Sequence, residues 1–179
     1  MLQLDNTALV VIDVQGNLAQ MMYKRDALFT NLEILIKAAK ELRIPILWNE
    51  QLPDKIGPTI PQLQVLLSNQ APLIKRSFSC CGEPQFMETL KKLTVTHLLI
   101  CGIEAHVCVY QTVRDLLAHG YRTHAISDAV SSRTGANKKI ALQRMRELGA
   151  VISSVEMALF ELLRVAEGNE FKSIIKLVK

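Results

Sequence analysis

The chain has 179 residues, which is the size of one ordinary domain and is enough to bury a core. Hydrophobic residues make up 49% and charged residues 21%, a composition that excludes a disordered chain. The net charge of +4 is mild, and no concentrated basic stripe is present. We therefore expect a single domain over residues 1–179 that binds no nucleic acid.

Short apolar runs alternate with longer segments of helical periodicity along the whole chain. The predicted strands are Ala8–Asp13, Ile46–Asn49, Leu73–Lys75, His97–Cys101, Arg122–Ile126 and Ala150–Ser153. The predicted helices are Leu28–Arg43, Pro61–Asn69, Pro84–Leu93, Ala105–His119, Ala136–Leu148 and Val155–Leu163, with one further turn after Glu170. This alternation predicts right-handed crossovers and a parallel sheet covered by helices on both faces.

Several element boundaries have a physical cause in the sequence. Pro45 ends the first long helix and introduces the second strand. Gly120 and Gly149 each follow a predicted helix, where a glycine commonly adopts the left-handed conformation that caps the helix. Residues 9–12 are apolar on both sides of the strand, as in a central strand of a parallel sheet.

The start of the chain does not resemble an export signal. Met1 is followed by Leu2-Gln3-Leu4-Asp5 rather than by a basic run and a long apolar stretch. The apolar run Ala8–Ile12 is too short to span a bilayer. We expect a cytoplasmic protein with no membrane partner, whose cysteines are thiols. These cysteines are Cys80, Cys81, Cys101 and Cys108.

Reactive side chains come where predicted strands end. Asp13 ends the first strand, where desolvation raises a carboxyl pKa and favours a general base. Lys75 ends the third strand, although Arg76 beside it is an alternative inward-facing cation. Gly102 permits a turn after the fourth strand and places Cys108 near the first turn of a helix, where the pKa of a thiol is lowered. The carboxyl ends of parallel strands share one edge of a sheet, so we expect an acid, a cation and a thiol to meet there.

Each of these residues also has a simpler explanation. Asp13 could cap a helix or lie in a loop, Lys75 could extend to solvent from an edge strand, and Cys108 could be a small core residue. The combination favours chemistry, because the acid would take the thiol proton and the cation would stabilise the charges that form.

Three segments together resemble the isochorismatase-like (cysteine hydrolase) family: Val11–Gln15, Lys75 followed by Phe78-Ser79, and Cys101–Val109. Asp128–Arg133 extends the resemblance, which runs roughly from Asn6 to Glu161. The family implies a three-layer α/β/α sandwich around a six-stranded parallel sheet.

The resemblance also implies an Asp-Lys-Cys triad, which falls on Asp13, Lys75 and Cys108. It further implies a cis peptide bond between Ile103 and Glu104, with backbone N–H groups there and at Cys108 facing an oxyanion. Such pockets are often completed by a neighbouring subunit, so a homo-oligomer is expected.

Within the family, Asn49–Gln51 with Gly57–Thr59 look most like the isochorismatase-domain-containing branch, whose substrates are poorly defined. The nicotinamidase branch carries a metal site of Asp and His residues after the second strand, whereas this chain has no histidine before His97. We expect no metal and no cofactor, and neither nicotinamide hydrolysis nor isochorismate cleavage is supported.

Further side chains are expected to line a substrate pocket or to have a structural role. The predicted pocket residues are Gln15, Trp48, Asn49, Gln51, Phe78 and Ala105. His106 lies two residues before Cys108, and residues two apart do not share a helix face, so we expect a hydrogen-bonded histidine rather than a Cys–His pair. Asp128, at the end of the fifth strand, is expected to cap a helix or to bind Arg133. A redox role for Cys80 and Cys81 stays open.

These observations favour a hydrolase that acts on a small-molecule substrate, at an amide or related C–N bond, through a thioester-type intermediate on Cys108. The alternative is a non-catalytic oligomeric binding or scaffolding protein with the same fold. A nucleotide-binding protein is disfavoured, because Asp13–Gly16 is not a glycine-rich phosphate loop.

Overall fold

Six strands form one parallel sheet in the order β3-β2-β1-β4-β5-β6, and the computed structural model describes residues 1–179. The strands are β1 Thr7–Ile12, β2 Ile46–Gln51, β3 Leu73–Lys75, β4 His97–Ile103, β5 Arg122–Ser131 and β6 Val151–Ser153. All five strand pairings are parallel, which confirms the predicted α/β fold with a six-stranded sheet.

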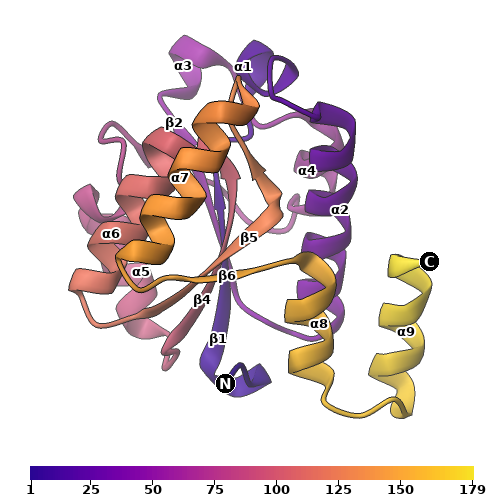
Figure 1. The fold of residues 1–179 in the computed structure, drawn as a ribbon. Helices are drawn as coiled ribbons and strands as arrows, with labels where there is room; N and C mark the ends of the chain where they lie inside the picture. Colours follow the sequence, from indigo (N-terminus) through magenta and orange to yellow (C-terminus); the bar gives the residue numbers. More distant parts are fainter.

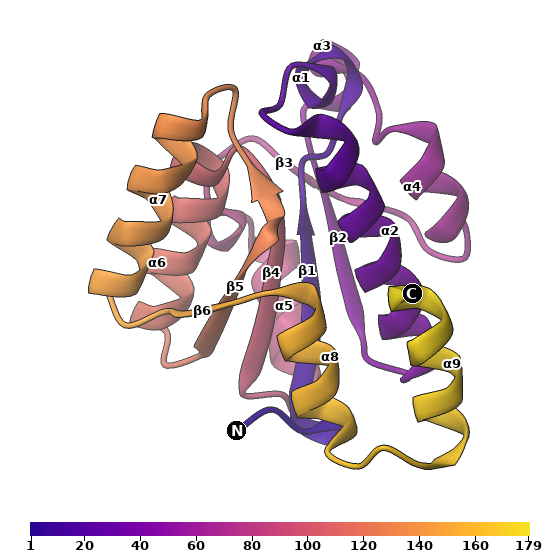
Figure 2. The same cartoon turned by 45° about the vertical axis from the view of Figure 1, so that its right-hand side comes forward.

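Helices cover both faces of this sheet, as the three layers in Figure 1 show. The helices are α1 Gly16–Gln20, α2 Arg25–Glu41, α3 Pro53–Ile56, α4 Pro61–Leu66, α5 Pro84–Lys92, α6 Tyr110–Ala118, α7 Gly135–Glu147, α8 Val155–Leu163 and α9 Gly168–Val178. Helices α2, α4, α8 and α9 pack on one face, and α5, α6 and α7 pack on the other (Figure 2). No helix combines the length and the apolar character that crossing a bilayer requires.

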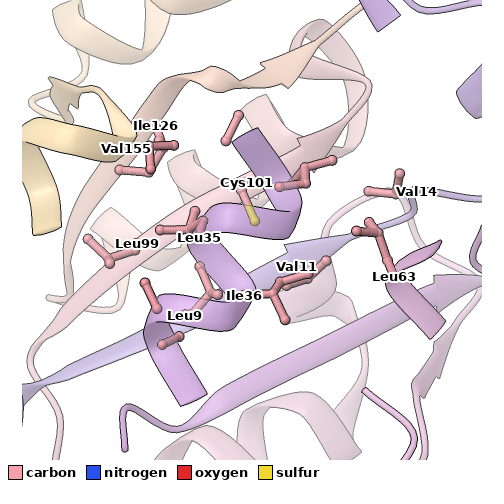
Figure 3. Packing of buried hydrophobic residues seen from close by; sticks show 14 of the residues in the cluster. Leu9, Val11, Val14, Leu35, Ile36, Leu63, Leu99, Cys101, Ile126 and Val155 are labelled. Atoms are coloured by element: carbon pink, nitrogen blue, oxygen red, sulfur yellow. The ribbon is translucent and has the colours of Figure 1, made fainter. Parts of the chain in front are cut away.

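The central strands alternate between two hydrophobic cores because successive side chains of a strand point to opposite faces. Leu9 and Val11 of β1 pack with Leu35 and Ile36 of α2 in the core drawn in Figure 3. The intervening side chains of β1, such as Val10, face the core under α5, α6 and α7. Because both sides are buried, the run is apolar throughout, as the sequence predicts.

Several elements differ from the prediction. The short helices α1 and α3 were not predicted, because four or five residues are too few to show a helical period. Strand β5 continues to Ser131 past a register shift opposite Ile100 and Gly102, so Asp128 lies within the strand rather than at its end. The tail forms the eleven-residue helix α9 instead of one turn, and it packs beside α2 (Figure 2).

The carboxyl ends of the strands meet at one end of the sheet, where α1 and α3 also lie (Figure 1). Gly102 allows β4 to approach β1 closely there. Its φ is +114°, and a Cβ at this position would lie 2.0 Å from the carbonyl oxygen of Ile12. Since Asp13 follows Ile12 directly, the glycine brings the turn after β4 against the residue predicted to be the base.

Candidate active site

Asp13 is the first residue after β1, and its backbone is left-handed with φ 51°, which is uncommon outside glycine. Its N–H donates to the carbonyl oxygen of Asn49 at 3.2 Å. The side chain is 3% exposed, and its Oδ2 lies 2.7 Å from Nζ of Lys75. Burial raises the pKa of the Asp13 carboxyl, while the charge of Lys75 acts in the opposite direction.

Lys75 ends β3 and points inward, whereas Arg76 is exposed, so Lys75 is the buried cation of the two. Besides the ion pair with Asp13, Nζ donates to Gln51 Oε1 at 2.6 Å. It also donates to the carbonyl oxygens of Ser77 and Phe78, each at 3.1 Å. An ammonium group has three hydrogens, so these contacts leave none free for a ligand.

Cys108 lies in a π-helical turn, Ala105–Val109, that precedes α6. Such turns are rare in proteins, and those that occur often lie at functional sites. The Sγ atom lies 3.7 Å from Gln51 Oε1, the same oxygen that accepts from Lys75. The thiol therefore shares a hydrogen-bonding partner with the buried cation.

The pKa of the Cys108 thiol is raised to about 12, first by burial and then by the negative charge of Asp13. Lys75 lowers it, but by less than those two causes raise it. The sequence expectation of a lowered thiol pKa is therefore wrong, because the cost of desolvating the thiolate exceeds the effect of the helix end and of the lysine. The thiol is protonated at neutral pH and needs a base to become a nucleophile.

The segment between β4 and the π turn carries Glu104. The peptide bond between Ile103 and Glu104 is cis, at the position that the family resemblance implies. The N–H of Glu104 donates to no acceptor within the protein. Glu104 Oε2 accepts from the backbone N–H and from Nε of Arg133, both at 3.1 Å. A backbone donor and an anchored carboxylate therefore lie beside the turn that holds Cys108.

A cavity of about 260 Å³ opens onto these groups. Its lining residues are Asp13, Leu18, Gln51, Leu52, Ile56, Phe78, Ile103, Glu104, Val107 and Cys108. Asp13 and Cys108 thus line the same space, which also has a largely apolar wall.

Of the predicted pocket residues, Gln51 and Phe78 line this cavity, and four others do not. The indole of Trp48 lies in the core under α2 and donates to Thr59 Oγ1 at 2.8 Å. Asn49 donates to the carbonyl oxygens of neighbouring strand residues. Ala105 is fully buried in the opposite core. These predictions are wrong because the side chains point into the layers of the fold rather than past the end of the sheet.

Gln15 is the fourth of these residues and acts behind the cavity wall. Its Nε2 donates to the carbonyl oxygens of Gln51 and Gly57, at 3.0 and 2.6 Å. Its Oε1 accepts from the N–H of Gln51 at 2.7 Å. The side chain therefore holds the wall residue Gln51 without reaching the cavity.

The cavity residues that the sequence analysis missed come from short elements. Leu18 belongs to α1. Ile56 is the last residue of α3, and Leu52 is the residue just before that helix. The spacing of Leu52 and Ile56, four residues apart, is the only local signal that they share a face. Val107, in the π turn, completes the apolar wall.

Other singled-out residues have structural partners. The ring of His106 makes hydrogen bonds to Ser132 Oγ at 2.9 Å and to Asn137 Nδ2 at 3.4 Å, which confirms a hydrogen-bonded histidine. Asp128 Oδ1 accepts from the N–H of Val155 and caps α8. Asp128 does not bind Arg133, which pairs with Glu104 instead.

The four cysteines are free thiols. No group of three or more histidine, cysteine, aspartate or glutamate side chains lies close enough together to hold a metal ion, and a reaction without metal or cofactor stays a prediction.

Comparisons with known proteins agree with this architecture. Residues 7–157 match the isochorismatase domain. The chain is 37% identical over 179 residues to the secreted isochorismatase effector Isc1 of Phytophthora sojae, covering 97% of this chain and 85% of that protein. It is 37% identical over 145 residues to human isochorismatase domain-containing protein 2, covering 81% of this chain and 69% of that protein. The solved structure of the MAR1 ribonuclease from Caenorhabditis elegans superposes with a TM-score of 0.92 at 36% identity, over 99% of this chain and 91% of that chain.

Proposed function

Because the chain belongs to the isochorismatase family, we propose that it is a cysteine hydrolase that cleaves an amide or related C–N bond of a small molecule. The observation that supports this most directly is the buried Asp13–Lys75 ion pair beside Cys108 at one cavity. A base, a cation and a thiol around one apolar space are the groups that covalent catalysis by a thiol needs.

In the first step, Asp13 takes the proton of the Cys108 thiol as the sulfur attacks the carbonyl carbon of the substrate. The raised pKa of Asp13 suits it to hold a proton during the reaction. Lys75 fixes the carboxylate in place through the 2.7 Å ion pair. The N–H of Glu104, which has no acceptor within the protein, is available to the oxygen that becomes negative.

In the second step, the C–N bond breaks, and the amine leaves with the proton from Asp13. An acyl group then remains on Cys108 as a thioester. A water molecule loses a proton to Asp13 and attacks the thioester carbonyl, and the C–S bond breaks as Asp13 returns that proton to the sulfur. The products are a carboxylic acid and the free thiol, so one water molecule is consumed for each amide cleaved.

The alternative is a non-catalytic binding or scaffolding protein that keeps the fold. The presence of all three reactive groups, two of them in the cavity wall and Lys75 paired with Asp13 behind it, argues against it. A homo-oligomer and a cytoplasmic location stay predictions, and the relative from Phytophthora sojae is named a secreted protein. The neighbour from Caenorhabditis elegans is named a ribonuclease, but the carboxylates and apolar side chains of this cavity favour an uncharged substrate over RNA.

The test is the variant Cys108→Ala, assayed against a panel of small amides with intact-mass detection of an acyl adduct. We expect the variant to lose the adduct and at least about 10³-fold in turnover, because the covalent route needs the sulfur. Cys81→Ala is the matched control, since Cys81 is a partly exposed thiol that does not line the cavity. Undiminished turnover in Cys108→Ala contradicts the mechanism. Absence of adduct and turnover in the unmodified chain supports the non-catalytic alternative.

A further inference from the structure

The charged side chains in the cavity wall are both carboxylates. Apart from the thiol, the titratable groups that line it are Asp13 and Glu104, and no lysine, arginine or histidine is among the lining residues. Asp13 has a cation behind it in Lys75, and Glu104 has one in Arg133. Neither cation lines the cavity, so the wall contains the negative member of each pair and neither positive member.

Both cations are engaged with other groups of the protein. Lys75 is 1% exposed, and its ammonium hydrogens are taken by Gln51, by two carbonyl oxygens and by the ion pair. Arg133 binds the carboxylate of Glu104 through Nε and its own backbone N–H. An anionic ligand would therefore lose water without gaining a positive partner among the residues that line the cavity.

The rest of the wall is apolar. Leu18, Leu52, Ile56, Phe78 and Val107 surround the approach to the thiol. The amide of Gln51 is already engaged, since its oxygen accepts from Lys75 and its nitrogen donates to the carbonyl oxygen of Arg76. A volume of about 260 Å³ accommodates on the order of ten non-hydrogen atoms, judged by the volume of liquid water.

From these features we infer that the cavity selects an uncharged carboxamide with a compact apolar substituent and turns away carboxylates and phosphates. This inference rests on the proposed role of Cys108 and adds the class of substrate. It also predicts that the cavity binds substrate better than product, because hydrolysis converts a neutral amide into a carboxylic acid that ionises at neutral pH. The negative wall then favours release of the product.

Two alkylating reagents of similar size test the charge preference. With iodoacetamide or iodoacetate, the sulfur of Cys108 forms a bond to the CH₂ carbon, the C–I bond breaks, and iodide leaves with the bonding electrons. The thiol proton passes to hydroxide in the mildly alkaline solvent. The rate of each reaction at Cys108 is measured by peptide mass spectrometry at mildly alkaline pH, with the neutral thiol 2-mercaptoethanol as the reference.

We expect the ratio of the iodoacetamide rate to the iodoacetate rate to be at least about tenfold larger at Cys108 than for the reference thiol, because only iodoacetate carries a charge. A ratio at or below that of the reference overturns the inference. If Cys108 reacts with neither reagent while the partly exposed Cys81 does, the proposed nucleophile is wrong, and the inference falls with it.

A charge introduced into the wall should invert the preference. Ile56→Lys places a cation in the cavity and is expected to raise the iodoacetate rate at Cys108 by about fivefold or more. Val65→Lys is the matched control, because Val65 is 72% exposed and lies outside the cavity. The inference is contradicted if the two variants raise the iodoacetate rate at Cys108 equally, or if neither variant raises it.

A measurement on the unmodified chain does not depend on the folding of a variant. Benzamide and benzoate differ in charge but are nearly equal in size, and each can be added as a competitor of iodoacetamide. We expect benzamide to protect Cys108 at a concentration at least about fivefold lower than benzoate. Equal or better protection by benzoate overturns the inference.

Discussion

Two clusters of buried titratable side chains lie toward opposite ends of the same sheet. Near the carboxyl end are Asp13 and Lys75 with the thiol of Cys108. Near the amino end, His97 of β4 and His124 of β5 are both 5% exposed, and their Nδ1 and Nε2 atoms lie 2.9 Å apart. Burying either cluster costs free energy, and the two clusters reduce that cost in different ways.

The carboxyl-end cluster keeps opposite charges in contact and opens onto a cavity, whereas the histidine pair avoids charge. Burial is the first cause that lowers the pKa of both imidazoles, to about 4 for His124. Neither ring lines the cavity that holds Cys108. Burial of a titratable group is therefore not by itself a sign of a reactive site. A retained charge pair with one member, Asp13, in a cavity wall distinguishes the carboxyl-end cluster.

The largest expected effect comes from Asp13→Asn, which removes the proposed base but keeps the shape of the side chain. We expect turnover to fall by about 10²–10⁴-fold, the range typical of a lost general base. Alkylation of Cys108 by iodoacetamide should become faster, because the charge of Asp13 raises the pKa of the thiol. Parallel rate measurements on the two reactions test this. If turnover and alkylation fall together, Asp13 acts by holding the structure instead.

The next effect concerns stability. Lys75→Met leaves the carboxylate of Asp13 buried without a cation, and we expect a loss of about 3–5 kcal/mol in the free energy of unfolding. The control is Lys37→Met, which breaks a partly exposed ion pair with Glu33 and should cost less than about 1 kcal/mol. Urea denaturation of both variants measures the difference. Equal losses would mean that the buried pair is hydrated more than its exposure indicates.

Much of the fold follows from the sequence because long periodic elements carry their own signal. The apolar run of β1 and the helix α8, Val155–Leu163, lie where the pattern places them. Helices α1 and α3 depend on contacts between distant segments, such as the antiparallel bridge between Gln15 and Thr59. The periodicity of a short segment cannot predict such contacts, because they join residues far apart in the sequence.

The same division holds for the site. Asp13, Lys75 and Cys108 were placed at one edge because each follows a strand of a parallel sheet, and the structure brings them to that edge. The predicted direction of the shift in the Cys108 pKa was wrong, because the shift depends on how completely the turn is buried. The wall residues Leu52 and Ile56 were missed, because their position depends on a short helix without a predictable period.

The smallest expected effect concerns the buried histidine pair, which is the uncharged cluster of the two. The pKa values of His97 and His124 are lowered in the folded chain, so the unfolded chain binds more protons between about pH 6.5 and pH 4. Their contribution to stability is complete above the unfolded value of 6.5 and is lost as the pH falls toward about 4. After allowance for solvent screening, this amounts to on the order of 1–2 kcal/mol.

The variant His124→Gln isolates that contribution, because it removes one imidazole and leaves the carboxylates, which also titrate in acid, unchanged. We expect the free energy of unfolding to depend less on pH in this window than in the unmodified chain, with no change in the alkylation of Cys108. His119→Gln is the matched control, since His119 is exposed at the end of α6. The charged groups that act on the pair are Arg122, Glu161 and the N-terminal amine, and all are retained in both variants. An unchanged pH dependence in His124→Gln would mean that the pair is not kept neutral by burial, and the contrast between the two ends of the sheet would then rest on the cavity rather than on charge.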